Sequence, residues 1–288
     1  MEAPPIMRAL EPEVIDAIWQ TVEPLLPANP DPEDHPLGCH RPRISDRVCF
    51  RGLMIRLVTG ASWVDIEALL DGQVSDTTLR ARRDEWIQAG VFDTLFDQAL
   101  AAYDRILGLD LDTVAIDGSL HKAPCGGEGT GPNPTDRGKI GHKWSIGVDG
   151  AGIPLGWELD GANRNDIPML KPTLTAIDRH GLLEEVGTLH LDRGYDYPKI
   201  RTMLTELGLT DVDIQKRGTK PTKGTPHRLT LALRWIVEAA NSWLPNHGQL
   251  RRSTDRRKPH RHAAMCLATV VLITGRLIDY RNRWSPTT

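Results

Sequence analysis

Hydrophobic residues recur at helical spacing through the first third of the chain, with polar residues between them. Apolar positions three to four residues apart lie on one face of a helix, so this spacing predicts amphipathic helices. Five helices are expected in this part of the chain, at residues 12–26, 45–59, 62–70, 77–87 and 91–107.

A short glycine-containing turn joins the third and fourth of these helices. Helix, short turn and basic helix is the helix-turn-helix pattern of DNA-binding proteins. The pattern places Arg80, Arg82 and Arg83 on the outer face of the fourth helix. If this helix recognises a DNA sequence, the residues that contact the bases are Thr77, Thr78, Arg80 and Arg83. A small helical bundle with a solvated basic face has the same pattern, and that alternative stays open.

After residue 108 the pattern changes to short apolar runs that alternate with helical segments. Strands are expected at residues 113–117, 144–148, 153–159, 189–192 and 212–215, and helices at 167–179, 198–207 and 228–244. The order β-β-β-α-β-α-β-α predicts a mixed α/β domain in which hairpin-linked strands precede βαβ crossovers. We therefore expect two domains, a helical DNA-binding domain over residues 1–108 and a catalytic α/β domain over residues 109–288.

Glycine and proline are frequent between the first two expected strands, at residues 124–139. This composition predicts a mobile loop. The segment lacks the G-x-x-x-x-G-K-[ST] spacing of a phosphate-binding loop, and no helix start follows it.

Three acidic residues stand at the ends or on the polar face of separate elements. Asp117 ends the first expected strand, Asp192 ends the fourth, and Glu238 lies within the last helix. Ligand sites in α/β sheets lie at the carboxyl ends of strands, and three neighbouring carboxylates repel one another unless a cation lies between them. Oxygen ligands of this kind suit Mg²⁺ or Mn²⁺, and two such ions about 3.5–4 Å apart support phosphodiester displacement.

Each of these acids also has a simpler interpretation. Taken alone, Asp117 and Asp192 could be turn or capping residues. Glu238 lies one helical turn after Arg234, which suits an ordinary i,i+4 ion pair. It is the joint arrangement that favours a metal site.

Three further aspartates compete for a role. Asp149 lies in an expected hairpin turn, Asp166 precedes Ile167-Pro168 as a helix cap would, and Asp196 precedes Pro198 similarly. All three are interpreted as structural, with Asp166 as the strongest exception.

Charge is unevenly distributed along the 288 residues. The net charge is −3, but residues 216–261 contain twelve Lys or Arg and two acids, a local charge of +10. This asymmetry favours an anionic partner, although a solvated basic surface remains an alternative. The N-terminus has no secretory signal pattern, and the apolar run at residues 263–274 is too short to span a bilayer and predicts a buried helix. We expect a cytoplasmic protein, associated with the nucleoid when bound to DNA.

Basic residues near the expected site are candidates for phosphate contacts, which dominate affinity for nucleic acids. An ordinary surface cation remains the alternative for each one. The candidates are Lys122, Lys143, Lys216, Arg217, Lys220, Lys223, Arg251, Arg252, Arg256, Arg257, Lys258 and Arg261.

Taken together, these motifs resemble the DDE transposases of bacterial insertion sequences, of the insertion-sequence family five type. The resemblance covers nearly the whole chain. It is carried by Ala115-Ile-Asp117-Gly-Ser, Ala162-Asn-Arg-Asn-Asp166, Leu191-Asp192-Arg-Gly-Tyr195 and Arg234-Trp-Ile-Val-Glu238, and by the arrangement from Arg41 through Trp63 to Trp86.

The resemblance implies a ribonuclease-H-like catalytic fold and metal-dependent DNA transposition. It implies that Asp117, Asp192 and Glu238 bind the metal, that Arg234 is a DNA-contacting arginine of the family signature, and that the partners are terminal inverted repeats and target DNA. It also implies a homodimer or larger assembly, since two element ends are brought together. Two signature positions differ: Leu231 replaces a tyrosine and Pro245 replaces a lysine. Arg251 or Arg252 could substitute for that lysine.

Two other functions fit the same sequence. One is a DNA-binding regulator, or a domesticated transposase, that keeps the helix-turn-helix and has lost catalysis. The other is a ribonuclease-H-like nuclease that does not join strands.

Overall fold

The computed structural model describes residues 9–28, 43–214 and 244–284, which form two compact units. The helical unit holds the described residues up to Ala102, together with His247–Leu250 and those from Pro259 onward. The sheet unit holds the described residues of Tyr103–Asn246 and of Arg251–Lys258. The predicted division of DNA binding and catalysis at residues 108 and 109 stays a prediction, and the compact units differ from it in grouping the C-terminal helix with the N-terminal helices.

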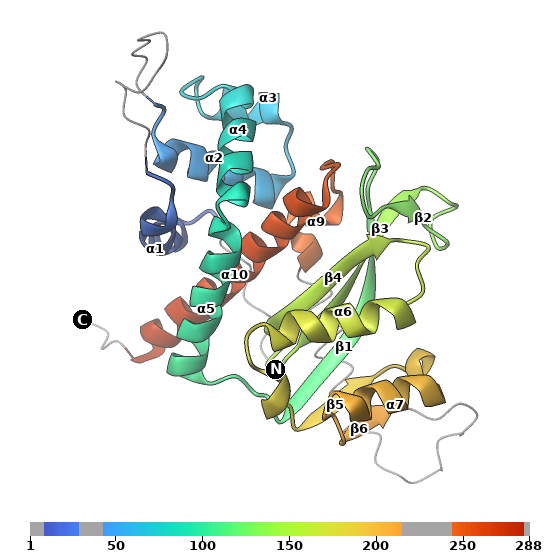
Figure 1. Cartoon of the computed structure of the whole chain (residues 1–288). Helices are drawn as coiled ribbons and strands as arrows, with labels where there is room; N and C mark the ends of the chain where they lie inside the picture. Colours follow the sequence, from blue (N-terminus) through green and yellow to red (C-terminus); the bar gives the residue numbers. More distant parts are fainter. Residues whose placement is uncertain (1–8, 29–42, 215–243, 285–288) are drawn as a thin grey trace. The chain divides into compact units, whose positions relative to one another are not determined.

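The helical unit confirms the amphipathic pattern of the first third of the chain (Figure 1). Each predicted helix is present, and each one buries apolar side chains, such as Ile18, Leu57, Ile66, Leu79 and Leu95. The helices are α1 (Pro12–Val22), η1 (Glu23–Leu25), α2 (Asp46–Thr59), α3 (Trp63–Leu69), α4 (Asp76–Gln88), the part of α5 (Val91–Leu107) up to Ala102 and the part of α10 (Lys258–Trp284) after Lys258.

Serine side chains start α3 and α4. The Ser62 oxygen accepts from the backbone N–H of Asp65 at 3.2 Å, and the Ser75 oxygen accepts from that of Thr78 at 3.2 Å. Each bond satisfies an N–H group that has no partner within the first turn of a helix. The helix-turn-helix pattern of α3 and α4 therefore has a defined start for both helices.

Helix α10 is longer than the predicted apolar run. Among the described residues it is the one helix long and apolar enough to cross a membrane. More than half of its most apolar stretch is buried inside the protein, which is typical of a core helix and matches the predicted buried helix.

The sheet unit contains a mixed six-stranded sheet, and its topology confirms the predicted ribonuclease-H-like architecture. The strand order is β2-β3-β1-β5-β6, and β4 also pairs with β3, along the edge that faces away from β1. Strands β1, β3 and β4 are antiparallel, whereas β5 and β6 are parallel to β1. The strands are β1 (Thr113–Lys122), β2 (Gly131–Pro132), β3 (Ile140–Val148), β4 (Pro154–Gly161), β5 (Thr188–Leu191) and β6 (Val212–Ile214).

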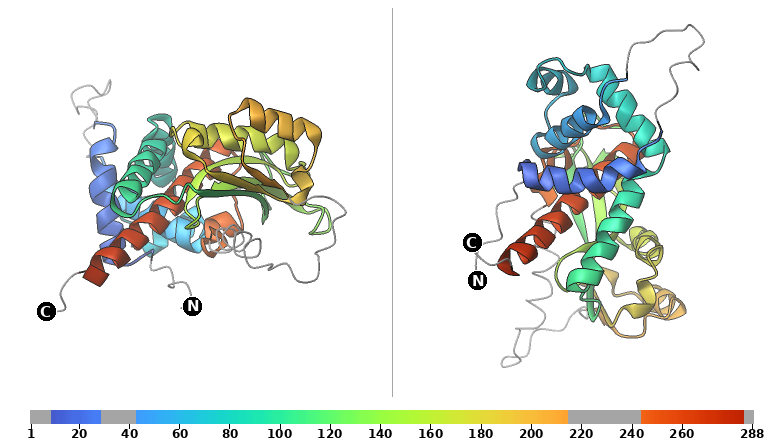
Figure 2. Two further views of the ribbon diagram at one scale, coloured as in Figure 1. Left: turned by 90° about the horizontal axis from the view of Figure 1, so that it is seen from below. Right: turned by 90° about the vertical axis from the view of Figure 1, so that its left-hand side faces the viewer.

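Two crossover helices, α6 (Ile167–Asp178) and α7 (Pro198–Glu206), cover one face of this sheet (Figure 2). Both connections advance in the same direction across the sheet, so right-handed crossovers place both helices on the same side. Helix α6 packs close to the sheet because the residues of β3 and β4 beneath Ile177 are glycines. A Cβ atom on Gly147 would lie 2.6 Å from Ile177 Cδ1, and one on Gly156 would lie 2.7 Å from Ile177 N.

Two predictions about the start of the sheet are wrong. Strand β1 does not end at Asp117 but continues to Lys122, because Gly118–Lys122 pairs with β3. The segment predicted as a mobile loop contains β2, and Glu128 N–H in it donates to the Arg256 carbonyl at 2.8 Å. A Cβ atom on Gly127 would overlap that carbonyl, so the glycine permits the close approach.

Short 3-10 turns connect the remaining elements, namely η3 (Leu183–Glu185), η4 (Arg193–Tyr195) and η5 (Leu244–Asn246), and α9 (Gly248–Arg251) follows η5. Apart from Leu244, the helix predicted at residues 228–244 lies outside the described residues, as does Gln215 at the predicted end of the last strand.

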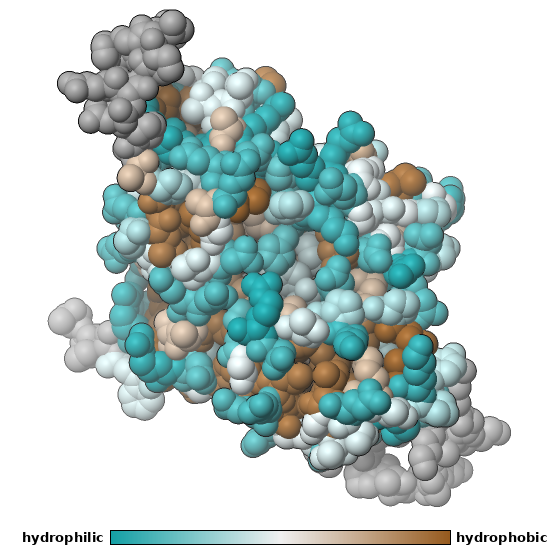
Figure 3. Space-filling model, in the orientation of Figure 1, coloured by the Kyte–Doolittle hydropathy of each residue, from teal (hydrophilic) through white to brown (hydrophobic). Residues whose placement is uncertain are grey.

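The surface of the described residues is mostly hydrophilic on the face shown in Figure 3, with hydrophobic residues in groups between polar ones. The large hydrophobic side chains that are exposed include Val64 and Leu69 of α3 and Trp284 at the end of α10.

Candidate functional site

The parallel pairing of β1 with β5 determines where two of the predicted acids lie. It runs from Thr113 opposite Thr188 to Ile116 opposite Leu191. Asp117 is the next residue of β1, and Asp192 directly follows the end of β5. Neighbouring strands lie about 4.8 Å apart, so the backbones of the two aspartates are neighbours at the carboxyl end of this pairing.

Both carboxylates are oriented by the residue that follows them. Gly118 N–H donates to Asp117 Oδ1 at 2.7 Å, and Arg193 N–H donates to Asp192 Oδ1 at 2.6 Å. Asp192 is also the N-cap residue of η4. The sheet therefore presents two hard oxygen donors with similar local geometry on adjacent strands.

Tyr195, at the end of η4, lies within the electrostatic reach of this pair. Its side chain is buried, and burial is the main reason that its pKa is raised above the ordinary value. The carboxylates of Asp166, Asp117 and Asp192 raise this pKa further, in that order, while Ser145 lowers it. The Tyr195 oxygen is buried and makes no hydrogen bond of normal geometry within the described part of the chain.

Asp166 is the N-cap residue of α6, as predicted, and its side chain also joins the site. Although it precedes α6, its side chain makes no capping bond to the described residues of that helix. Its Oδ1 atom instead accepts from Lys143 Nζ at 2.9 Å. A Cβ atom on Gly118 would overlap this carboxylate oxygen, which shows that Asp166 packs directly against the residue after Asp117. Asp166 therefore occupies the predicted N-cap position, but its side chain contacts Lys143 and Gly118 and does not cap the helix.

The other two competing aspartates are structural. Asp149 closes its hairpin turn by accepting from Ala151 N–H at 3.0 Å and Ile153 N–H at 2.7 Å, as predicted. Asp196 forms an ion pair with Arg201 at 2.9 Å, and Tyr197, not Asp196, is the N-cap residue of α7.

The third predicted acid, Glu238, lies outside the described residues. So do Leu231 and the predicted DNA-contacting residues Lys216, Arg217, Lys220, Lys223 and Arg234. Pro245 lies within η5, where the family signature that the chain resembles has a lysine.

Several predicted DNA-contacting residues form a basic strip in the sheet unit. The segment that carries them is fixed at both ends: Ser253 N–H donates to the Lys122 carbonyl at 2.9 Å, and Lys258 N–H donates to Glu128 Oε2 at 3.0 Å. Residue 252 also bridges to residue 122 at the end of β1. We define the basic strip as the exposed residues Lys122, Arg251, Arg252, Arg256 and Arg257.

Other predicted cations are committed to contacts within the protein. The Lys143 side chain is 11% exposed, and Nζ donates to Asp166 and, at 2.8 Å, to the Arg164 carbonyl. Lys258 is less exposed than the strip and pairs with Glu158 at 3.4 Å. Arg261 is buried.

The predicted outer-face position of Arg82 and Arg83 on α4 is wrong. Both are buried, and the Arg83 guanidinium lies 5.0 Å from the centre of the Trp63 ring. Arg80 is exposed and pairs with Asp76 at 2.8 Å. Trp63 of α3 accounts for the inward position of Arg83, because a guanidinium can stack on an aromatic face. Arg82 instead forms an ion pair with Asp46 and donates to the Ile44 carbonyl at 3.3 Å.

The donor set around Asp117 and Asp192 fits a hard divalent cation, which prefers carboxylate oxygens. Two participants were missed by sequence reasoning. Gly118 gives no signal of its own, and Tyr195 stood only as the last residue of the motif Leu191-Asp192-Arg-Gly-Tyr195. The signal for Asp166 was its place in Ala162-Asn-Arg-Asn-Asp166.

Known protein families match both parts of the chain. Residues 108–274 match the family model described as "Transposase DDE domain". Residues 14–96 match the family model described as "Putative transposase of IS4/5 family".

Two curated relatives come from Burkholderia cepacia. The chain is 38% identical over 133 residues to "Putative transposase for insertion sequence element IS402", an alignment that covers 44% of this chain and 60% of that protein. It is 33% identical over 125 residues to "Insertion element IS402 uncharacterized 16.2 kDa protein", covering 43% of this chain and 82% of that one. The chain thus spans less than two thirds of the first relative.

Solved structures that the chain matches weakly include "Crystal structure of a pre-cleavage Mos1 transpososome", at 10% identity and a TM-score of 0.28, covering 88% of this chain and 82% of that chain. Another is "Crystal structure of the Mos1 mariner paired end complex with Mn", at 10% identity and a TM-score of 0.28, covering 91% and 87%.

Proposed function

Because the chain belongs to the transposase DDE domain family, we propose that it cuts DNA at the ends of an insertion element and joins those ends to target DNA. The observation that carries this proposal is the parallel register of β1 and β5, which leaves Asp117 and Asp192 side by side. Both have a second carboxylate oxygen besides the one that accepts a backbone N–H group.

Glu238 is the proposed third carboxylate. It stands in the Arg234-Trp-Ile-Val-Glu238 motif, and with Asp117 and Asp192 it completes the acid set of the resembled family. Three carboxylates that converge without a cation would destabilise one another, so the set is suited to holding a positive charge.

Family membership implies dependence on a divalent metal. We propose Mg²⁺, with Mn²⁺ as a substitute, in a two-metal site. When bound, such ions activate a water or a 3′-hydroxyl and stabilise the leaving oxygen. The protein residues have the task of holding the carboxylates in place: Gly118 and Arg193 donate backbone N–H groups to Asp117 and Asp192. Lys143 holds Asp166 against the strand that carries Asp117.

The basic strip is the proposed path for the DNA backbone within the sheet unit. Its arginines are exposed, and its backbone is tied to the end of β1, the strand that carries Asp117. Residues advance about 3.3 Å along a strand, so the five steps from Asp117 to Lys122 span roughly 16 Å. That length corresponds to about ten phosphate positions of duplex DNA, counting both strands at one per about 1.7 Å.

End recognition is proposed for the helix-turn-helix of α3 and α4. With Arg83 buried, base contacts would fall to Thr77 and Arg80, which are exposed on α4. Bringing two element ends together would require two or more copies of the chain, acting on DNA in the cytoplasm.

The test is metal-dependent cleavage and joining of a duplex that carries the terminal repeats flanking the gene. Asp117→Asn, Asp192→Asn and Glu238→Gln should each abolish cleavage in Mg²⁺ and in Mn²⁺ while leaving binding to the duplex intact. Asp160→Asn is the matched control, because Asp160 Oδ1 also accepts from the next residue, Gly161, at 2.7 Å but lies on β4.

The outcomes separate the three possible functions. Cleavage with joined products supports a transposase, and cleavage without joining supports a nuclease. Binding without cleavage in the unmodified protein supports a regulator that has lost catalysis. Cleavage that persists in Asp117→Asn or Asp192→Asn would overturn the site.

A further inference from the structure

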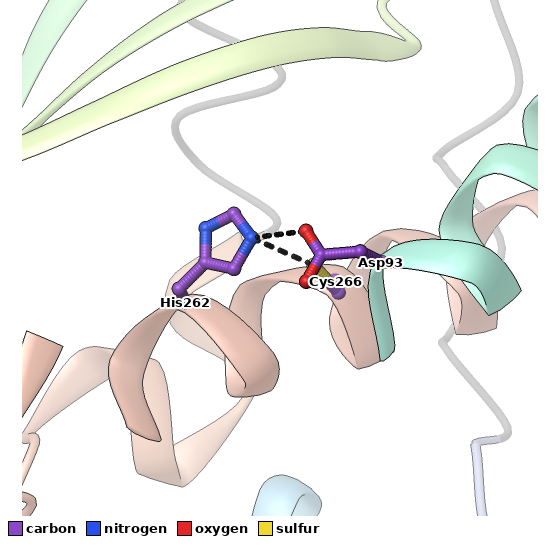
Figure 4. A group of neighbouring side chains, drawn as sticks. All are labelled: Asp93, His262 and Cys266. Carbon is purple, nitrogen blue, oxygen red and sulfur yellow. Dashed lines mark hydrogen bonds and ion pairs between the residues drawn. The ribbon is translucent and has the colours of Figure 1, made fainter. Parts of the chain in front are cut away.

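A second group of metal-binding side chains lies in the helical unit. Asp93 is in the first turn of α5, and His262 and Cys266 are one turn apart on α10 (Figure 4). One ligand atom from each lies within 4.8 Å of the other two. We propose that Asp93, His262 and Cys266 form a zinc site, separate from the carboxylates of the sheet.

The spacing of the three atoms is close to that of a zinc coordination shell. In a tetrahedral site with bonds of about 2.0 Å to nitrogen and about 2.3 Å to sulfur, the nitrogen and sulfur ligands lie about 3.5 Å apart. Cys266 Sγ lies 3.5 Å from His262 Nε2. His262 Nε2 lies 2.8 Å from Asp93 Oδ1, and this pair needs to widen only to about 3.3 Å.

The backbone supports this arrangement. Residues four apart on a helix lie on the same face, so His262 and Cys266 point to one place without any loop between them. Asp93 comes from a helix 169 residues earlier in the chain. A metal at this position would therefore connect α5 to α10.

The chemistry of the group favours zinc over the metals proposed for the sheet. Thiolate and imidazole ligands suit Zn²⁺, whereas Mg²⁺ and Mn²⁺ prefer oxygen. Cys266 is buried, and the side chains of His262 and Asp93 are 37% and 42% exposed. Such a site has a buried sulfur and an open side where a water can complete four ligands.

Binding has a defined proton balance. The Cys266 thiol gives up its proton to solvent to become a thiolate, and His262 binds through an unprotonated Nε2 while its remaining proton is on Nδ1. No oxidant or reductant is required.

The test uses the full-length protein, freed of metal with a chelator and titrated with Zn²⁺ against a chromophoric competitor. We expect one tightly bound Zn²⁺ per chain and a higher melting temperature of the protein. Changes to groups outside the ligand shell typically weaken metal sites by about 10–100-fold, so loss of a ligand in Cys266→Ala or His262→Gln should weaken Zn²⁺ binding by more than about 100-fold. Cys125→Ala, which removes an exposed thiol of the sheet unit, should leave binding unchanged.

Cobalt provides a second measurement that does not require a variant to fold. Co²⁺ bound to the unmodified protein should give the near-ultraviolet band of a thiolate-to-cobalt transition, which carboxylate ligands cannot produce. Unchanged Zn²⁺ affinity in Cys266→Ala, or a cobalt spectrum without this band, would overturn the site and leave an ordinary ion pair beside a buried thiol. Neither result depends on the DNA chemistry of the sheet unit.

Discussion

The pairing of Ile116 with Leu191 is the last parallel pair between β1 and β5, and it leaves Asp117 and Asp192 as neighbours on adjacent strands. The backbone hydrogen bonds between β1 and β5 fix the positions of both residues. The two acids are therefore brought together by the sheet itself and do not depend on the conformation of a long loop.

The first prediction is that Asp117 and Asp192 act as one unit. Asp117→Asn and Asp192→Asn should each lower the cleavage rate by about 10³-fold or more, since losing a metal ligand removes several kcal/mol of transition-state stabilisation. The double variant should be scarcely slower than either single one, because groups that serve one metal centre are not additive. Single-turnover cleavage rates measure this. Rates that multiply in the double variant would show that the two acids act separately.

The second prediction concerns the contact between Gly118 and Asp166. Gly118→Ala should destabilise the protein by about 1–3 kcal/mol, the usual cost of overpacking, because the new methyl group overlaps the Asp166 carboxylate. It should also slow cleavage, since Gly118 donates its N–H to Asp117. Urea unfolding measures the first effect and the cleavage rate measures the second.

A compensating variant tests the cause. Combining Gly118→Ala with Asp166→Ala removes the overlapping carboxylate and should recover most of the stability. Gly275→Ala is the control, because a methyl group there meets no neighbouring atom within 4 Å. If the combined variant were less stable than Gly118→Ala alone, the overlap would not be the cause.

The third prediction is a pH dependence that originates at Tyr195. Its pKa in the folded protein is raised, first by burial and then by Asp166, Asp117 and Asp192. Above pH 10, near the ordinary tyrosine pKa, the unfolded chain loses the phenolic proton while the folded chain keeps it. Stability from this group is therefore fully present below about pH 10 and falls by about 1.4 kcal/mol per pH unit above it.

Tyr195→Phe isolates this effect. The free energy of unfolding of the variant should fall less steeply than that of the unmodified protein between about pH 10 and pH 12, the range just above the ordinary tyrosine pKa. Urea unfolding at a series of pH values measures the difference. Parallel curves for the two proteins would show that Tyr195 ionises equally easily in both states.

Sequence reasoning located the elements better than it located their contacts. Asp192 was identifiable because an apolar strand ends there, and the amphipathic stripe of α1 was visible from spacing alone. The end of β1 was misplaced because Gly118–Lys122 is largely polar, and its extension depends on pairing with β3. Local sequence does not reveal such pairing.

The same limit applies to the site. Asp166 reaches Lys143 across 23 residues, and its proximity to Gly118 results from the position of α6 over the sheet. Arg83 is charged and was expected on the surface, but Trp63 offers it an aromatic face inside the helical unit. Both outcomes depend on tertiary packing, which overrides the local preference of each residue. The role of Glu238 stays a prediction.

The last prediction compares the contribution of the basic strip to DNA binding with that of lysines elsewhere on the sheet unit. Replacing both Arg256 and Arg257 with Ala should weaken binding to a short duplex of arbitrary sequence and reduce the slope of log affinity against log salt by about 1.8, since each phosphate contact contributes about 0.9. Lys171→Ala with Lys199→Ala removes the same charge from exposed positions on α6 and α7 and should leave the slope nearly unchanged.

Lys143→Met should lower the stability of the protein, because it leaves Asp166 without its lysine partner. It should change the slope little, because Nζ of Lys143 is already bound by Asp166. Fluorescence anisotropy titrations over a range of salt concentrations measure all three. A slope that responds equally to the strip and to the α6 and α7 lysines would show that net charge, and not the position of the strip, determines DNA binding.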